Sequence, residues 1–366
     1  MRMKFYLLLS ALLIWIPSWP ATAVVVDDLY TIELPVADQT TSHRLEAFSE
    51  AFQQVLTKVS GSDEAQESSA ISRLTPGSSR YVKQFSYVNR PGVDAEGAAQ
   101  NFMYLKIDFD QQQIEQILRN HSFPVWGRER PSILLVINSQ AGGKIQLVSG
   151  DATPEIVSML DTAALNRGVP TLLPLMDLED IGLISVADVT SRRFDTIGNM
   201  AVRYGPDALV VGEIVEQSAE SWRGAWEVRF AEQIFKWKFQ AETSQAVIDE
   251  LVMHLASVLA LEYALEDHQR NEQDLLLQVS SMSDLSRLIS VQKYLESLNA
   301  VESAHVSFIS GSDVTFRLKL RNSTEDLQRL IEFGNVLEQQ GFPQINAQTQ
   351  GGAIINYNYV GRGASN

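Results

Sequence analysis

The sequence contains no cysteine. Disulfide bonds, thiolate metal sites, cysteine nucleophiles and a lipidated N-terminal cysteine are therefore excluded. The fold must be held together by packing alone, which a chain of 366 residues allows because it is long enough for two or three domains.

Basic residues are also scarce. The chain has 29 Lys and Arg against 45 Asp and Glu, for a formal charge of −16, and loss of Arg2 and Lys4 with a signal peptide would leave 27 against 45, or −18. No Lys/Arg run offsets this excess, so nucleic acid and anionic lipid would be repelled. We expect no nucleic-acid partner.

The motifs of catalysis and metal binding are missing as well. No Gly-x-Ser-x-Gly motif occurs, residues 138–145 lack the first glycine of a phosphate loop, and Ser290 and Lys293 have the Ser-x-x-Lys spacing without its companion motifs. The histidines show no metal-ligand spacing: His43, His121, His254, His268 and His305. We therefore predict a protein that is not an enzyme and has no catalytic residues, no metal and no cofactor.

The N-terminus has the features of an export signal. Arg2 and Lys4 precede an apolar run over residues 5–16, and Ala21 and Ala23 supply small residues for cleavage. The run is shorter than the about 20 residues of a membrane-spanning helix. We predict a signal peptide over residues 1–23, a mature chain that starts near Val24 and works in the periplasm, and no integral membrane span after cleavage. A retained N-terminal anchor is the alternative.

Hydrophobic periodicity divides the remainder into three predicted domains. Residues 24–125 read as a small α+β domain, with a strand at 30–36, a helix at 41–60, strands at 85–87 and 103–109, and a short helix at 114–118. Residues 126–272 read as an α/β domain with a mixed sheet. Its strands at 133–137, 171–173 and 208–215 alternate with helices at 154–166 and 193–204, and an aromatic hairpin and a long helix from Thr243 follow.

Residues 273–366 have the order of a ferredoxin-like βαββαβ domain. Strands are expected at 275–279, 304–309, 314–320 and 354–360, and helices at 285–298 and 324–339. The predicted fold class is therefore α+β multidomain.

Three tryptophans, Trp222, Trp226 and Trp237, gather on the aromatic hairpin. Large rings on a hairpin are typical of a core covered by a helix, and an exposed platform for a protein partner is the alternative. They are the candidate protein-binding residues of the sequence.

Several segments resemble the DUF2066 family: residues 55–61, residues 81–87 and residues 126–131, the last reading Trp-Gly-Arg-Glu-Arg-Pro. The resemblance extends over nearly the whole mature chain. It implies an exported gamma-proteobacterial protein without an established activity, and it supplies no catalytic residues.

The middle region is also weakly similar to periplasmic domains of the TolB N-terminal, curli-secretion and penicillin-binding-protein-activator types. The similarity rests on the core strand, on residues 201–212 and on the aromatic hairpin, and it departs where Pro206 follows Gly205. It implies binding to other envelope proteins, by analogy of fold.

These observations predict a non-catalytic periplasmic interaction or assembly factor of the Gram-negative cell envelope, whose partner is another envelope protein. A small-ligand-binding protein with a cleft between domains, and a hydrolase with an unrecognised site, are the alternatives. The sequence indicates neither the partner nor the oligomeric state.

Overall fold

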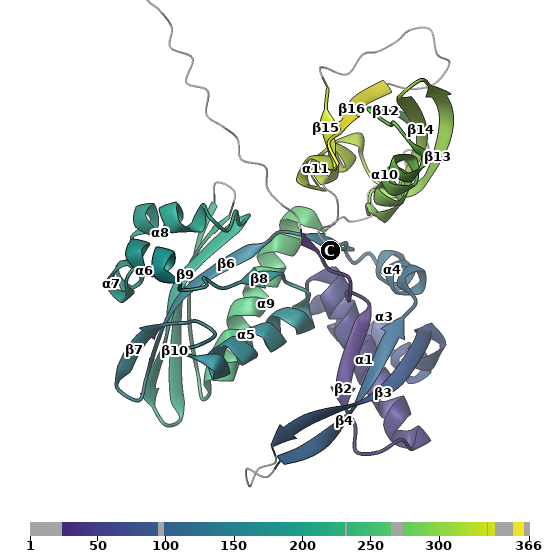
Figure 1. The fold of residues 1–366 in the computed structure, drawn as a ribbon. Coiled ribbons are helices and arrows are strands. Elements are labelled where there is room, and N and C mark those ends of the chain that lie inside the picture. The colour runs from purple at the N-terminus through teal and green to yellow at the C-terminus, as the bar shows by residue number, and fades with distance from the viewer. Residues whose placement is uncertain are drawn as a thin grey trace, which may run out of the picture.

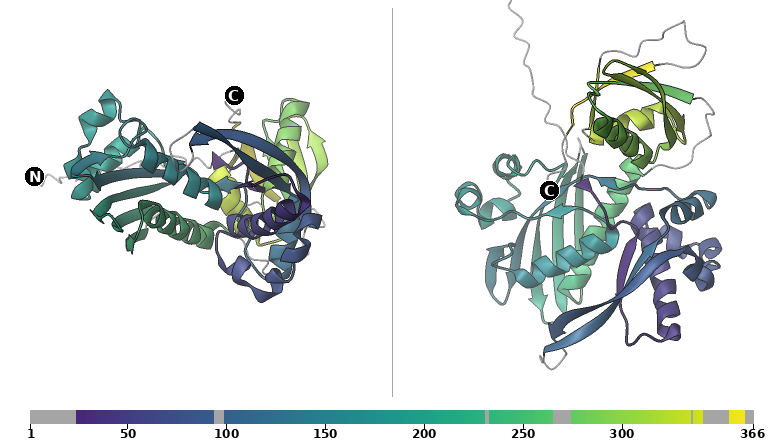
Figure 2. Two further views of the ribbon diagram at one scale, coloured as in Figure 1. Left: turned by 90° about the horizontal axis from the view of Figure 1, so that it is seen from below. Right: turned by 45° about the vertical axis from the view of Figure 1, so that its right-hand side comes forward.

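The computed structural model describes residues 24–93, 99–230, 233–264, 274–334, 336–340 and 354–361. The predicted signal peptide over residues 1–23 lies outside this part of the chain. The described residues form a mixed α/β protein with four sheets, and Figures 1 and 2 show three bodies, here called the N-terminal, middle and C-terminal modules. This agrees with the predicted multidomain arrangement, while the domain boundaries stay a prediction.

The N-terminal module is an antiparallel sheet of order β2-β4-β3 covered by helices. Its strands are β2 (Thr31–Pro35), β3 (Val82–Val93) and β4 (Ala99–Phe109), and its helices are α1 (Thr41–Ser60), α2 (Glu64–Glu67), α3 (Ser69–Ser72), the 3-10 helix η1 (Thr75–Tyr81) and α4 (Gln111–Asn120). Phe52, Val55 and Leu56 of α1 pack in one core with Leu105 and Ile107 of β4. The helical spacing of those apolar residues is what the sequence predicted.

The middle module is a six-stranded mixed sheet of order β11-β10-β9-β6-β7, with β8 beside β6. Its strands are β6 (Ile133–Ala141), β7 (Lys144–Leu147), β8 (Thr171–Leu172), β9 (Ala208–Ser218), β10 (Ser221–Phe230) and β11 (Gln233–Ala241). Gly142 and Gly143, both at positive φ, form the tight β6–β7 turn, so residues 138–145 belong to a β-hairpin.

Helices cover both faces of this sheet, as the continuous apolar run in β6 predicts (Figure 1). Leu135 and Ile137 pack in the core with α5 (Pro154–Arg167) and α9 (Ser244–Tyr263). Leu134 and Val136 point to the opposite face, toward α7 (Val186–Thr190) and α8 (Phe194–Ala201). The short helix α6 (Leu178–Leu183) lies beside α8.

Helix α9 is, in the part of the chain that the structure describes, the single helix long and apolar enough to cross a membrane. The sequence predicts no membrane span after cleavage of the signal peptide. Val247, Leu251 and Leu255 of α9 are buried in the middle module. This packing is typical of the core helix of a soluble domain.

The C-terminal module has a five-stranded sheet of order β13-β14-β12-β16-β15. The strands are β12 (Asp274–Ser280), β13 (Val301–Ser310), β14 (Asp313–Leu320), β15 (Leu337–Gln339) and β16 (Ile354–Tyr359), and the helices are α10 (Leu285–Ser297) and α11 (Thr324–Gly334). The predicted helix over residues 324–339 is too long, because the chain leaves the helix after Gly334 and forms β15.

The pairing in this sheet departs from the predicted ferredoxin-like unit. The last strand, β16, runs parallel to β12, and β15 pairs antiparallel with β16 at the sheet edge. Strand β15, which follows β14 through α11, therefore runs parallel to β14 but is separated from it by β12 and β16. Strand β16 is thus an additional strand, inserted between β12 and β15, that a βαββαβ unit does not have.

The three modules meet at the segment from Val125 to Arg130. Strand β5 (Glu129–Arg130) pairs with β1 (Val24–Val25), and the Asn299 side chain of the C-terminal module donates a hydrogen bond of 2.8 Å to the Val125 carbonyl. Trp126 is buried in the core of the middle module, and its backbone N–H donates to Val59 at the end of α1. The junction is therefore built from bonds to all three modules.

Two of the segments that carried the DUF2066 resemblance touch each other at this junction. Gly61 adopts a φ of +75°, and a Cβ there would lie 2.4 Å from the Cβ of Ala260 and 2.9 Å from the Trp126 ring. Both the left-handed backbone and the close approach require glycine. Residues 55–61 and 126–131 thus form one packed unit.

Candidate functional site

The tryptophans of the hairpin take different positions. Trp226 is 3% exposed and belongs to the core of the middle module, where it pairs across the strands with Trp237. Trp222 and Trp237 are half-buried against the same core. Trp226 therefore offers no surface to a partner in this conformation, and of the three only Trp222 and Trp237 remain partly accessible.

Trp237 lies in a row of aromatic side chains on β11, the edge strand of the sheet. Its ring centroid is 6.0 Å from that of Phe235 and 6.5 Å from that of Phe239. His254 of α9 covers the row, 5.5 Å from Trp237 and 4.7 Å from Phe239. Helix α9 thus covers the hairpin. Binding of a partner by the hairpin tryptophans stays a prediction.

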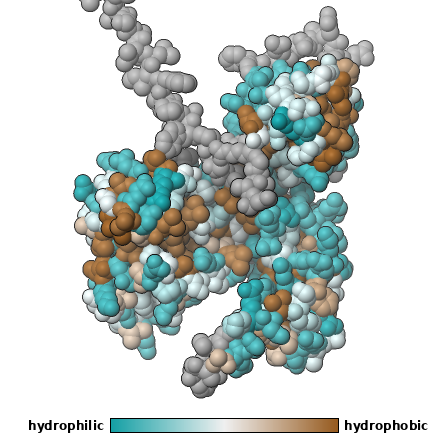
Figure 3. Space-filling view, viewed as in Figure 1, coloured by the Kyte–Doolittle hydropathy of each residue, from teal (hydrophilic) through white to brown (hydrophobic). Residues whose placement is uncertain are grey.

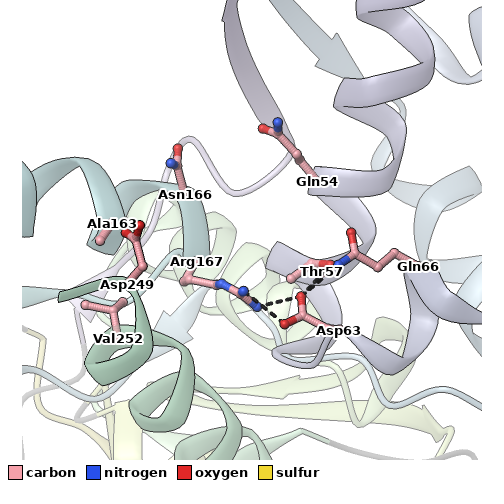
Figure 4. Close-up of a pocket in the computed structure, with 9 residues that line it drawn as sticks. All are labelled: Gln54, Thr57, Asp63, Gln66, Ala163, Asn166, Arg167, Asp249 and Val252. Atoms are coloured by element: carbon pink, nitrogen blue, oxygen red, sulfur yellow. Dashed lines mark hydrogen bonds and ion pairs between the residues drawn. The ribbon is translucent and has the colours of Figure 1, made fainter. Parts of the chain in front are cut away.

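A cleft of about 300 Å³ separates α1 and α2 from α5 and α9 (Figure 4). Arg167 reaches across it from the end of α5 to Asp63, and its two Nη atoms lie 2.8 and 3.0 Å from the two carboxylate oxygens. Gln66 and Thr57 donate further hydrogen bonds to the same carboxylate. The charged groups of this cleft therefore join the N-terminal module to the middle module.

A larger cleft of about 680 Å³ lies between the N-terminal and C-terminal modules. Both walls carry both signs of charge. The N-terminal module contributes Lys83, Asp110, Glu115 and Arg128, and the C-terminal module contributes Glu296, Glu302 and Arg321. The Arg128 guanidinium donates to the Asp27 carbonyl and lies over the Tyr30 ring. The cleft is polar, and its size suits a small polar ligand.

Helix α6 has an unusual distribution of exposed and buried residues for a surface helix. Leu178 is 92% exposed and Ile181 is 60% exposed, whereas the carboxylate of Asp180 is completely buried. Apolar residues of a surface helix normally turn toward the core and charged residues toward water. In α6 the apolar Leu178 and Ile181 face solvent together with Glu179, and Asp180 is the buried residue.

A polar network holds α6 in this orientation. The buried Asp180 carboxylate accepts hydrogen bonds from the Tyr204 hydroxyl, from Arg203 and from the backbone N–H of Met176. The Tyr204 hydroxyl in turn accepts from the backbone N–H of Leu175. Met176 has a φ of +54°, which lies in the left-handed region. This conformation costs free energy in any residue other than glycine. The orientation of α6 is thus fixed by specific bonds.

The N-terminus of α6 is fixed by a second set of bonds. Asp177 caps the helix by accepting from the backbone N–H groups of Glu179 and Asp180, at 3.1 Å each. Arg203 donates to both oxygens of the same carboxylate, at 2.6 and 2.9 Å. These bonds, with that from Arg203 the strongest, lower the pKa of Asp177 well below its usual range. Asp177 therefore stays ionised at any physiological pH.

The outcome is a surface of large apolar side chains, here called the α6 patch. Figure 3 shows apolar residues gathered over α6, α7 and α8. The patch consists of five exposed side chains: Leu175, Leu178, Ile181, Leu183 and Val202. Large contiguous apolar patches are uncommon on the surface of monomeric soluble proteins, and those that occur often mark sites of interaction.

Sequence reasoning missed the α6 patch. Leu175, Leu178 and Ile181 recur every three residues beside Asp177, Glu179 and Asp180, which is an amphipathic signal. That signal indicates two faces but not which one is buried. The buried Asp180 could have been found only from its partners Arg203 and Tyr204, more than twenty residues away.

The fold and the patch together define a multi-sheet mixed α/β protein with an exposed apolar surface. The predicted resemblance to DUF2066 is confirmed, by a match to the model of that family over residues 277–341. A second family, described as a domain of unknown function (DUF8605), matches residues 23–127. No curated protein matches the chain.

The extent of the DUF2066 match differs from the prediction. It lies within the C-terminal module, whereas the residues on which the resemblance rested fall in or next to the DUF8605 match. The match supports the resemblance over residues 277–341, and its predicted extent over the rest of the mature chain stays a prediction. Neither match reaches the α6 patch, and the similarity of the middle region to TolB-type domains is not confirmed.

Proposed function

We propose that this chain is a non-catalytic interaction or assembly factor of the bacterial cell envelope, exported by an N-terminal signal peptide and active in the periplasm. One observation supports it above the others, namely that α6 presents Leu178 and Ile181 to solvent while it buries Asp180. A protein gains no stability from this arrangement, because the exposed leucine forgoes burial worth about 1.5–3 kcal/mol. Docking of a partner would bury the leucine.

We further propose that the middle module is of the TolB N-terminal type and the C-terminal module of the ferredoxin-like type. The parallel pair β6 and β9 followed by the hairpin β10–β11 supports the first assignment. The order β12-α10-β13-β14-α11 supports the second, although the added strand β16 sets the module apart.

Site-specific photo-crosslinking in cells tests the proposed function. A photoreactive residue replaces Leu178 in one strain and Leu261 in a second, since the latter is a leucine of nearly equal exposure, 88%, at the end of α9. We expect an adduct with another envelope protein from position 178 and none from position 261. Equal labelling at both positions, or none at 178, would contradict the proposal.

The larger cleft favours a second candidate function, that of a small-ligand-binding protein. Its volume of about 680 Å³ and its polar wall are the supporting observation. A bound ligand would stabilise the folded chain by mass action. The test is a thermal-shift screen of periplasmic metabolites. A metabolite that raises the melting temperature of the protein, but not that of an Arg128→Ala variant, would favour this function.

A further inference from the structure

We propose that the α6 patch docks on a protein surface whose apolar centre is edged by Lys or Arg side chains. This inference rests on the proposed function and adds the chemistry of the partner. It follows from the charges that border the patch.

The border of the patch is acidic. The Arg203 guanidinium forms ion pairs with three carboxylates. Its nitrogen atoms lie 2.6 Å from an oxygen of Asp177, 3.6 Å from one of Glu179 and 3.3 Å from one of Asp180. One positive charge against three negative charges gives this group a net charge of −2, and because Asp180 is buried, Asp177 and Glu179 are the acids exposed at the border. Glu179 is the most accessible of the three acids, with 65% of its side chain exposed.

The arginines at the far end of α7 do not offset this charge. Arg193 is paired with Asp188 at 3.0 Å, so that pair is neutral. Arg192 turns inward and donates to the carbonyls of Val189 and Ala225. The excess negative charge at the patch has the same sign as the chain, whose formal charge is −16.

This charge distribution disfavours a lipid surface. Helices that lie on membranes carry Lys and Arg beside their apolar face, because phospholipid leaflets are commonly anionic. The α6 patch has the opposite sign at its border. An anionic bilayer would attract Leu178 and Ile181 but repel Glu179 next to them.

A second copy of this chain is disfavoured for the same reason. A two-fold interface brings the same patch of both subunits together, so the acidic borders would face each other. Like charges placed across an interface cost free energy, whereas opposite charges favour association. The occupant that satisfies both the apolar centre and the acidic border is a different protein with a basic border.

The test uses the full exported chain and two synthetic amphipathic helical peptides with the same leucine face, one with lysines and one with glutamates on the polar face. We expect saturable binding of the lysine peptide, weakened by salt, and at least about tenfold weaker binding of the glutamate peptide. Vesicles of phosphatidylglycerol are the third probe and should not bind.

Leu178→Glu separates specific docking from general attraction to an acidic protein. It adds a negative charge, so purely coulombic binding of the lysine peptide would become stronger. Docking on the patch would instead weaken about tenfold or more, while Leu261→Glu leaves it unchanged. Glu179→Lys should weaken binding severalfold and reduce its salt dependence.

The inference is overturned if the glutamate peptide or the vesicles bind as well as the lysine peptide, or if Leu178→Glu binds the lysine peptide as tightly as the unchanged protein does. Those results leave the proposed function standing if position 178 still yields its adduct in cells. Absence of that adduct instead refutes the proposed function itself. The two failures are therefore distinguishable.

Discussion

Arg130 shows how one buried side chain ties the modules together. Its guanidinium is completely buried and lies over the Trp126 ring at 4.0 Å. All five N–H groups are used, because five hydrogen bonds run to the backbone carbonyls of Lys58, Trp126, Gly127, Arg167 and Gly168. Only a planar guanidinium has this number of donors in a fixed arrangement.

Arg130→Lys should therefore destabilise the protein. Lysine has three donors on a flexible chain, so at least two buried carbonyls lose their partner, each at a cost of about 1–3 kcal/mol. We expect a loss of about 2–6 kcal/mol in the free energy of unfolding, measured by urea denaturation. Arg90→Lys is the control, since Arg90 forms a mostly exposed ion pair with Glu33 and should change stability by less than about 1 kcal/mol. Equal effects at the two sites would refute the role of Arg130.

Trp226 is held between two glycines of the sheet. A Cβ at Gly212 would lie 2.2 Å from its ring, and one at Gly224 would lie 2.6 Å from its Nε1. The indole thus fills space that these glycines leave open, and its removal creates a large cavity.

Trp226→Ala should cost about 3–5 kcal/mol of stability, as expected for a buried aromatic residue. The half-buried Trp222 is the comparison, and Trp222→Ala should cost less. Thermal unfolding of both variants measures the difference. A Trp226→Ala protein of normal stability that has lost a partner would instead make the hairpin a binding site.

At the scale of the elements, the sequence predicted the long, strongly periodic segments well. Helices α1 and α9 have enough apolar repeats, and strand β6 a long enough continuous apolar run, to determine their class, and each packs as its pattern requires. The short elements α6 and β15 were missed, because they have too few residues to establish a period. Their conformation is decided by contacts distant in sequence, such as that of Tyr204 with Asp180 in α6.

Tyr204→Phe tests whether the polar network holds α6 in its orientation. The change removes the hydroxyl that donates to Asp180 and accepts from Leu175, a loss of about 1 kcal/mol per hydrogen bond. We expect amide hydrogen exchange in residues 175–183 to accelerate by about tenfold, with the amides of β6 as the internal control. Unchanged exchange in α6 would show that its orientation has another cause.

For the whole molecule, the contact that attaches the C-terminal module contains a partly buried acid, Glu129. Oε2 of Glu129 is buried without a hydrogen bond, and a Cβ at Gly334 of α11 would lie 2.8 Å from it and 2.2 Å from the Tyr294 hydroxyl. Burial raises the pKa of Glu129 from 4.5 to about 7. Tyr294 of α10 has a raised pKa as well, first from burial and then from the charge of Glu129, so it stays protonated near neutral pH.

Other bonds hold the same contact without a titrating group. The Tyr263 ring packs at a tilt against the Phe333 ring with a centroid distance of 4.7 Å, and the Asn299 side chain donates a hydrogen bond to the Val125 carbonyl. Glu129 therefore modulates a contact that persists when its charge changes. The contact should respond gradually to pH.

The sign of this dependence follows from the raised pKa. Below pH 4.5, Glu129 is protonated in both the folded and the unfolded chain, and its burial carries no charge penalty. As the pH rises from 4.5 to about 7, the unfolded chain releases the proton first, so the folded state loses stability across this window. Above about pH 7 both states are ionised and the penalty is constant.

Glu129→Gln should remove this part of the pH dependence, because the amide stays neutral at every pH. We expect the variant to gain on the order of 1–3 kcal/mol over the unchanged protein above pH 7 and little below pH 4.5, measured as unfolding free energy across that range. Glu325→Gln, at an exposed position of α11, is the matched control and should leave the profile unchanged. A parallel shift of the Glu129→Gln profile at all pH values would mean that the carboxylate is not buried at this contact in solution. A profile that converges at low pH and diverges through neutrality would establish Glu129 as a group whose burial makes the folded protein more stable in acid.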